Sequence, residues 1–243
     1  MRQIIIGLTI LALTACRQDR AADAGALSGA SDTIDAPPAS VPAAPGRPDH
    51  VVLFIGTSIT AGYGIGEEFA YPAVIQQMID SAGLPYRVSN AGVSGETSAG
   101  GLRRIDWALQ QPIDVLVVEL GANDGLRGLP VADMRADLDS LLSRARARYP
   151  DVRIVLLGME APPNLGEAYT TAFRSVFPEL AARHDAALVP FVLDSVVADR
   201  SLNIEDGVHP NPAGHRIIAR NVWRALGPVL RAHAAQRVRS DSS

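Results

Sequence analysis

The sequence VVLFIGTS at residues 51–58 has five apolar residues in a row, followed by glycine, threonine and serine. A continuous apolar run that ends at a glycine is typical of a strand buried on both faces of a parallel sheet. Ligands bind outside the carboxyl ends of the strands in such sheets, so Ser58 is expected where a nucleophile could act. Taken alone, glycine and serine fit an ordinary turn after a strand equally well. Partners from elsewhere in the chain are therefore needed before Ser58 can be interpreted as reactive.

Outward from this strand, apolar strand-like runs alternate with amphipathic helix-like segments. Further strands are expected at residues 87–90, 114–120, 153–158 and 187–191. Helices are expected at residues 71–82, 98–110, 131–148, 166–184 and 212–232. Pro178 is expected to kink or break the helix that contains it, and Asn211 to cap the last one. This alternation predicts an α/β fold with a parallel sheet covered on both faces by helices.

Composition excludes several classes of protein. Apolar residues make up 47% of the 243-residue chain and charged residues 20%, which suits one packed domain of useful size or two small ones. The formal charge of −4, with no long basic run, argues against nucleic acid as a partner. Cys16 is the single cysteine, so an intrachain disulfide and a thiolate metal cluster are excluded. The five histidines form no His-x-x-x-His pair, so no metal site is predicted.

The first residues have the pattern of a secretory segment. Arg2 supplies a positive charge, residues 4–13 form an apolar run too short to span a membrane comfortably, and small residues precede Cys16. We interpret residues 1–16 as a bacterial lipoprotein signal with Cys16 as the lipidated residue; the alternative is a plain secretion signal. Arg17 after the cysteine indicates outer-membrane sorting if the host has an outer membrane. The protein is thus expected at the cell envelope, facing the periplasm and held to the membrane by lipid.

Residues 17–50 are rich in alanine and proline and contain too little apolar mass to bury, so they are predicted to form a disordered tether. A flexible chain of this length spans about 30 Å, enough to hold a domain clear of lipid headgroups. The folded domain is expected at residues 51–232, followed by a disordered tail at 233–243. We expect a monomer.

Candidate catalytic residues follow the predicted strands, and their loops meet at one edge of the sheet. Acyl transfer from an ester requires a nucleophile, a base, a group that orients the base, and donors for the oxyanion. Ser58 is the candidate nucleophile, His209 the base and Asp206 the group that holds the imidazole. Gly95 can offer a backbone N–H and Asn123 a side-chain amide. Each of these residues also suits an ordinary turn or cap, but their occurrence together favours a site.

Several segments resemble those of the SGNH hydrolases, also called the GDSL esterase/lipase family. The matching segments are residues 55–64, 90–97, 118–128 and 206–211. They span most of the predicted domain, and their order along the chain makes the resemblance specific. The chain is most similar to the branch that contains periplasmic acyl-thioesterase/lysophospholipase and arylesterase enzymes.

This resemblance implies a flavodoxin-like three-layer α/β/α sandwich. It also implies a catalytic triad of Ser58, Asp206 and His209, and an oxyanion hole formed by the Ser58 N–H, the Gly95 N–H and the Asn123 side chain. No metal or organic cofactor is implied. The implied substrates are small acyl or aryl esters.

Three residues complete this interpretation. Thr57 stands where the family pattern has Asp; because that Asp is not a triad member, the chemistry is expected to persist. Ser94 is a rival nucleophile, but it lacks the second flanking glycine of a Gly-x-Ser-x-Gly elbow and is ranked low. His215 lies inside the last predicted helix and is interpreted as structural or solvated.

The expected acyl pocket lies between the loops at residues 125–130 and 159–166. Its apolar candidates are Leu126, Leu129, Met159, Ala161, Pro162, Pro163 and Leu165. The sequence therefore predicts a serine esterase that acts through an acyl-enzyme, with acyl thioesters and lysophospholipids as further candidate substrates. Two alternatives remain open: a carbohydrate O-acetyl esterase of the envelope, and a non-catalytic lipoprotein that binds acyl ligands.

Overall fold

Residues 50–240 are described by a computed structural model of the protein. The predicted lipoprotein signal with Cys16, the tether up to residue 49 and residues 241–243 lie outside the described residues. Within the described part of the chain, no helix is both long and apolar enough to cross a membrane.

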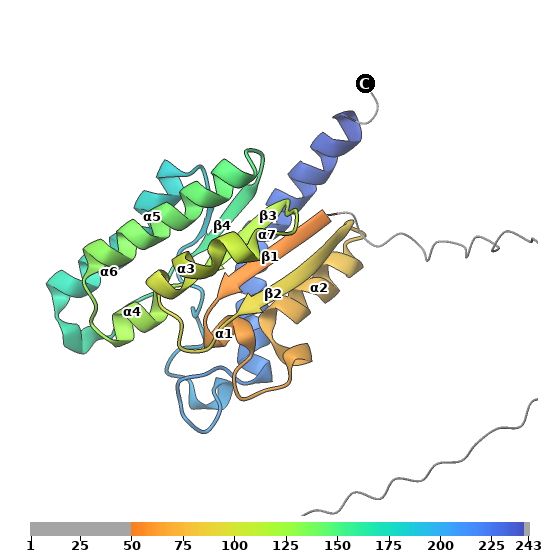
Figure 1. The fold of residues 1–243 in the computed structure, drawn as a ribbon. Coiled ribbons are helices and arrows are strands. Elements are labelled where there is room, and N and C mark those ends of the chain that lie inside the picture. Colours follow the sequence, from red (N-terminus) through yellow and green to blue (C-terminus); the bar gives the residue numbers. More distant parts are fainter. Residues whose placement is uncertain (1–49, 241–243) are drawn as a thin grey trace, which may run out of the picture. The chain divides into compact units, whose positions relative to one another are not determined.

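The described strands form one sheet of five parallel strands in the order β2-β1-β3-β4-β5 (Figure 1). They are β1 (His50–Gly56), β2 (Tyr86–Gly92), β3 (Val115–Glu119), β4 (Arg153–Leu157) and β5 (Ala187–Val189). This is the strand order of flavodoxin-like folds, so the predicted α/β class is confirmed. Because β1 and β3 are neighbours, Gly56 pairs with Glu119 at their carboxyl ends.

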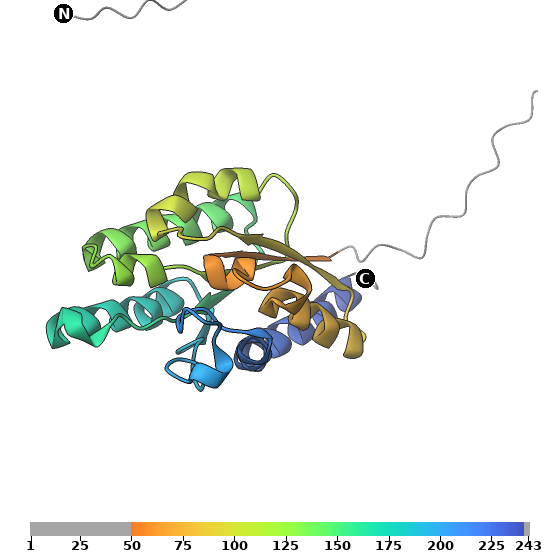
Figure 2. The ribbon, with the colours of Figure 1, turned by 90° about the horizontal axis from the view of Figure 1, so that it is seen from below.

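Helices cover both faces of this sheet. The α-helices are α1 (Ser58–Ala61), α2 (Tyr71–Ser81), α3 (Ser98–Ala108), α4 (Ala122–Leu126), α5 (Val131–Arg148), α6 (Glu167–Arg183) and α7 (Pro212–Ser240). Short 3₁₀ helices are η1 (Glu67–Phe69), η2 (Pro163–Leu165) and η3 (Arg200–Leu202). Helix α2 packs against α7, whereas α3 packs against α5 and α5 against α6. Figure 2 shows α2 and α7 on one side of the sheet and α3 and α5 on the other.

The central strands lie entirely in the core. The apolar residues 51–55 make up five of the seven residues of β1, and all of them are buried. All five residues of β3 are buried as well. A strand covered by helices on both faces buries side chains that point either way, which explains why the apolar run shows no alternation. The polar residues that follow these strands are therefore fixed to rigid elements.

Two predictions about helices need correction. Helix α6 runs from Glu167 to Arg183 through Pro178, so the break that was the second of the two expectations for this proline is absent. Its buried side chains, which include Phe177 and Leu180 on either side of the proline, hold the helix to the core although one backbone N–H is missing.

The end of α7 was also placed too early. The predicted cap is present, because Asn211 Oδ1 accepts from the N–H of Ala213 at 2.9 Å. The helix, however, continues to Ser240, so the predicted disordered tail is wrong for residues 233–240. His233 is buried with its Nδ1 2.7 Å from the Tyr86 hydroxyl, and this contact holds the extra turns against the sheet.

Candidate active site

The nucleophile candidate Ser58 begins α1 directly after β1. Gly56 makes this turn possible, because a Cβ there would lie 2.0 Å from Thr60 Oγ1 and 2.9 Å from Glu119 Oε2. Only glycine lets the first turn of α1 fold back onto the end of β3. Ser58 is thereby held at the carboxyl edge of the sheet.

The structure brings Ser58 and His209 together although 151 positions separate them. Ser58 Oγ lies 2.9 Å from His209 Nε2, and His209 Nδ1 lies 2.6 Å from Asp206 Oδ2. The other Asp206 oxygen accepts from the backbone N–H of Val208 at 2.8 Å and of His209 at 2.9 Å. One aspartate thus shapes the turn and orients the imidazole that the turn carries.

These contacts define the proton positions. The backbone N–H groups of His209 and Val208, followed by the His209 side chain, lower the pKa of Asp206 to about 2. Asp206 is therefore ionised at neutral pH and can only accept, so Nδ1 of His209 donates to it. Nε2 is left to accept the Ser58 hydroxyl proton. The arrangement can move a proton from Ser58 to His209.

Tyr63 contributes a contact that sequence reasoning missed. Its ring centroid lies 4.6 Å from that of His209, at an interplanar angle of 44°. Tyr63 follows the single turn of α1. In the sequence it is an aromatic residue in a loop, and nothing there indicates a contact with His209. The ring covers one side of the imidazole and limits where it can move.

The two other predicted donors line the same cavity as Ser58 and His209. Gly95 has φ of +78°, a conformation that glycine adopts without strain. Asn123 lies in α4, and its Nδ2 donates to the carbonyl of Glu96 at 2.9 Å. Because an amide nitrogen carries two hydrogens, the second remains available for a developing oxyanion.

Two arginines hold the loop that carries Gly95, and sequence reasoning assigned a role to neither. Arg127 donates to the Gly95 carbonyl at 2.9 Å. Arg104 donates to the carbonyl of Ala91 at 2.7 Å and, through Nε, to Glu96 Oε1 at 2.7 Å. Their positions are fixed by α4 and α3, so the loop is anchored from both sides.

The cavity over Ser58 has a volume of about 510 Å³ and a largely apolar wall. Of the predicted wall residues, five line it: Leu126, Met159, Ala161, Pro162 and Pro163. Leu129 and Leu165 do not, and this part of the prediction is wrong. Further apolar lining comes from Ile59, Tyr63, Phe191, Leu193, Val197, Ala198 and Val208.

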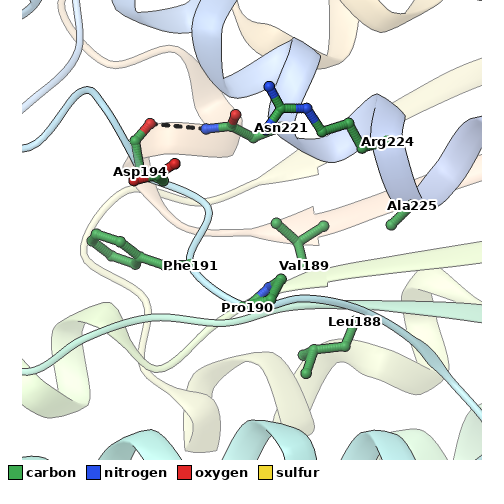
Figure 3. Close-up of a pocket in the computed structure, with 8 residues that line it drawn as sticks. All are labelled: Leu188, Val189, Pro190, Phe191, Asp194, Asn221, Arg224 and Ala225. Atoms are coloured by element: carbon green, nitrogen blue, oxygen red, sulfur yellow. Dashed lines mark hydrogen bonds between the residues drawn. The ribbon is translucent and has the colours of Figure 1, made fainter.

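A second cavity of about 430 Å³ lies beside β5 and α7 (Figure 3). Asn221 projects from α7 and donates to the carbonyl of Asp194 at 2.9 Å, and Arg224 lies one helical turn further on. Phe191 lines both cavities. No predicted site residue lines this second cavity, which sets it apart from the candidate active site.

The remaining predictions concern Ser94, His215 and metal binding. No hydrogen bond joins Ser94 to a described histidine, whereas Ser58 has one. His215 is fully buried and accepts from the Tyr71 backbone N–H at 3.1 Å, so it is structural and not solvated. Among residues 50–240, no cluster of three or more His, Cys, Asp or Glu side chains is arranged to hold a metal ion.

Comparison with known proteins identifies the family. The model of the GDSL-like lipase/acylhydrolase family matches residues 54–217, which include the whole candidate site. The chain belongs to this family. The predicted resemblance is thereby confirmed, and the protein is an ester hydrolase of the GDSL type.

Individual relatives agree with this assignment. The chain is 41% identical to esterase TesA of Pseudomonas aeruginosa over 182 residues, 74% of this chain and 90% of that protein. It is 34% identical over 181 residues to thioesterase 1/protease 1/lysophospholipase L1 of Escherichia coli K12, covering 74% and 84%. The crystal structure of AlinE4, an SGNH-hydrolase family esterase, matches with a TM-score of 0.62 and 38% identity, covering 79% of this chain and 96% of AlinE4.

Proposed function

We propose that this protein is a serine esterase that hydrolyses carboxylic esters through an acyl-enzyme on Ser58. The observation that carries the proposal is the continuous hydrogen-bonded series from Ser58 Oγ to His209 at 2.9 Å and from His209 to Asp206 at 2.6 Å. These are the distances at which a base takes a proton from a nucleophile and an anion stabilises the resulting imidazolium.

In the first half of the reaction, Ser58 Oγ bonds to the acyl carbon while its proton passes to His209 Nε2. The oxyanion accepts hydrogen bonds from the N–H groups of Ser58 and Gly95 and from Asn123. The bond to the leaving alcohol then breaks, and the imidazolium returns its proton to that alcohol. Water repeats the sequence on the acyl-enzyme, releasing the acid and restoring Ser58.

The cavity supports acyl or aryl groups as substrates. Its 510 Å³ exceed what an acetyl group occupies, and its wall includes Ile59, Met159 and Leu193. These features favour aryl or short-to-medium acyl esters, acyl thioesters and lysophospholipids over the O-acetyl groups of carbohydrate. The intact hydrogen bond between Ser58 and His209 favours catalysis over ligand binding alone.

A series of p-nitrophenyl esters tests both points. We expect kcat/KM to rise from acetate to butyrate and hexanoate, because each buried CH₂ contributes about 0.8 kcal/mol, roughly a fourfold gain. A fluorophosphonate probe should label the peptide that contains Ser58, as read by mass spectrometry. Activity confined to acetyl esters would favour the carbohydrate esterase, and absence of labelling would favour the non-catalytic alternative.

We also propose that the enzyme is anchored to the cell envelope by lipid on Cys16. Support comes from the short apolar run before this single cysteine of the chain. Cys16→Ser is expected to move the protein from the membrane fraction to the soluble fraction of the producing bacterium, because acyl chains supply the attachment. The activity of the released enzyme is the control. Retention of Cys16→Ser in the membrane after high-salt washing would contradict a lipid anchor.

A further inference from the structure

A buried carboxylate lies directly beneath Ser58, and the mechanism above does not use it. Glu119 ends β3 and has no exposed surface. No described Arg or His forms an ion pair with it. Its carboxylate instead contacts Thr57 and Thr60, the residues that flank Ser58 at the start of α1.

Four donor groups point at this carboxylate. The Thr57 N–H lies 2.9 Å from Oε2 and the Thr60 N–H 3.3 Å from it. The Thr57 hydroxyl lies 3.0 Å from each oxygen, and the Thr60 hydroxyl 2.8 Å from Oε2. An ionised carboxylate can accept from all of them. A protonated one must donate its own hydrogen, so one of the threonine hydroxyls can no longer donate to the carboxyl group.

The network extends to other titratable groups. The Thr60 hydroxyl is also 2.8 Å from the Tyr71 hydroxyl on α2, and the Tyr71 N–H donates to His215 on α7. Burial, together with the nearby Glu119, raises the pKa of Tyr71 well above its ordinary value, and burial lowers the pKa of His215 to about 4. Both groups therefore stay neutral around pH 7, and neither supplies charge to Glu119.

Glu119 differs from these neighbours. Burial raises its pKa to about 7, although the hydrogen bonds from Thr57 and Thr60 act in the opposite direction. Its protonation state therefore changes within the pH range in which an esterase would be assayed.

We propose that ionised Glu119 is a positioning residue for Ser58. By binding Thr57 and Thr60 it holds the first turn of α1 so that Ser58 Oγ meets His209 and the Ser58 N–H faces the oxyanion. Loss of the carboxylate charge loosens this turn and slows attack by Ser58. The proposal rests on the proposed role of Ser58 as nucleophile.

The pH dependence has opposite signs for activity and stability. Activity requires ionised Glu119, so it falls as the pH drops through about 7, the pKa to which burial raises Glu119. Stability follows the other direction. Because the folded state holds the Glu119 proton to higher pH than the unfolded chain, the free energy of unfolding decreases as pH rises from 4.5 through about 7.

Glu119→Gln in the full-length chain tests the proposal. Gln keeps the shape but replaces one acceptor oxygen by an NH₂ group that faces donors. At about pH 8 we expect fluorophosphonate to label Ser58 about 10²-fold more slowly, with unchanged affinity for the probe. In acid, where wild-type Glu119 is protonated, the two rates should converge. The matched control is Asp114→Asn at the other end of the sheet, where the carboxylate accepts from the Val51 N–H at 2.9 Å; it should label at the wild-type rate.

A second variant keeps the test decisive if Glu119→Gln does not fold. Thr57→Asp places a second carboxylate beside Glu119, so the pair retains a proton to higher pH, and the acid limb should shift upward by about one pH unit or more. Two results would overturn the positioning role alone, provided that the probe labels Ser58 in the wild type. One is a labelling rate and pH profile of Glu119→Gln equal to those of the wild type. The other is an acid limb of Thr57→Asp that is not shifted from that of the wild type. A wild-type enzyme that is not labelled at Ser58 would overturn the proposed function and this inference with it.

Discussion

Ser58→Ala is expected to lower kcat for p-nitrophenyl butyrate on the order of 10⁶-fold, to the residual rate that binding and oxyanion donors support. The substitution removes the oxygen that lies 2.9 Å from His209 Nε2, so His209 has no nucleophile to deprotonate. The Ser58 backbone N–H remains, and the fold should too, because alanine is the best helix former at the start of α1. The measurement is steady-state hydrolysis, with the unfolding temperature as a check on the fold.

The matched control is Ser94→Ala, which removes a hydroxyl from the neighbouring loop. Ser94 has no hydrogen bond to a described histidine, so turnover should stay within about an order of magnitude of wild type. If Ser58→Ala retained wild-type turnover while Ser94→Ala lost it, the nucleophile would have been assigned to the wrong loop.

Asp206→Asn is expected to lower kcat by about 10⁴-fold with little change in KM. Asparagine can still accept from the N–H groups of Val208 and His209, so the turn should persist. Its NH₂ group, however, would face His209 Nδ1, which lies 2.6 Å from the present oxygen. This stabilises the imidazole tautomer with hydrogen on Nε2, which cannot take the proton of Ser58.

Two further measurements separate this effect from a structural one. Asp199→Asn is the matched control, because Asp199 accepts from the Ser201 N–H at 2.9 Å and shapes a similar exposed turn without contacting a histidine. It should leave kcat unchanged. Because the pKa of Asp206 is lowered to about 2, the ionised carboxylate contributes to the free energy of unfolding at every pH above its ordinary pKa. This contribution is lost only as the pH falls through about 2. An equal loss of kcat in Asp206→Asn and Asp199→Asn would contradict this assignment.

The sheet and the meeting of the candidate site residues could be predicted from the sequence for one physical reason. Apolar runs such as residues 51–55 identify parallel strands, and parallel strands bring their following loops to one edge. Ser58, His209 and Asp206 could therefore be predicted to meet, and the structure places them within hydrogen-bond distance. The contact between Asp206 and His209 could also be predicted, because a single turn is enough to bring a carboxylate to a ring three residues later.

Other features depend on tertiary packing that a local pattern does not contain. Glu119 was predicted only as one residue of the strand at 114–120, and it is its contacts with Thr57 and Thr60 that suggest a role. The possible break at Pro178 was expected because the local cost of a proline was considered without the packing that holds α6 to the core. Leu129 and Leu165 were assigned to the cavity from their loops, although side-chain direction determines which loop residues line it.

The path of the chain also affects how this enzyme can be handled. His50 begins β1 and its ring lies 5.8 Å from that of His233 near the end of α7, whereas Ser58 follows the other end of β1, about 20 Å away. Both ends of the described chain therefore lie at the end of the sheet opposite α1, the helix that Ser58 begins (Figure 1). A fusion partner or solid support joined directly to either end of the described residues, before His50 or after Ser240, would leave the cavity over Ser58 open to substrate.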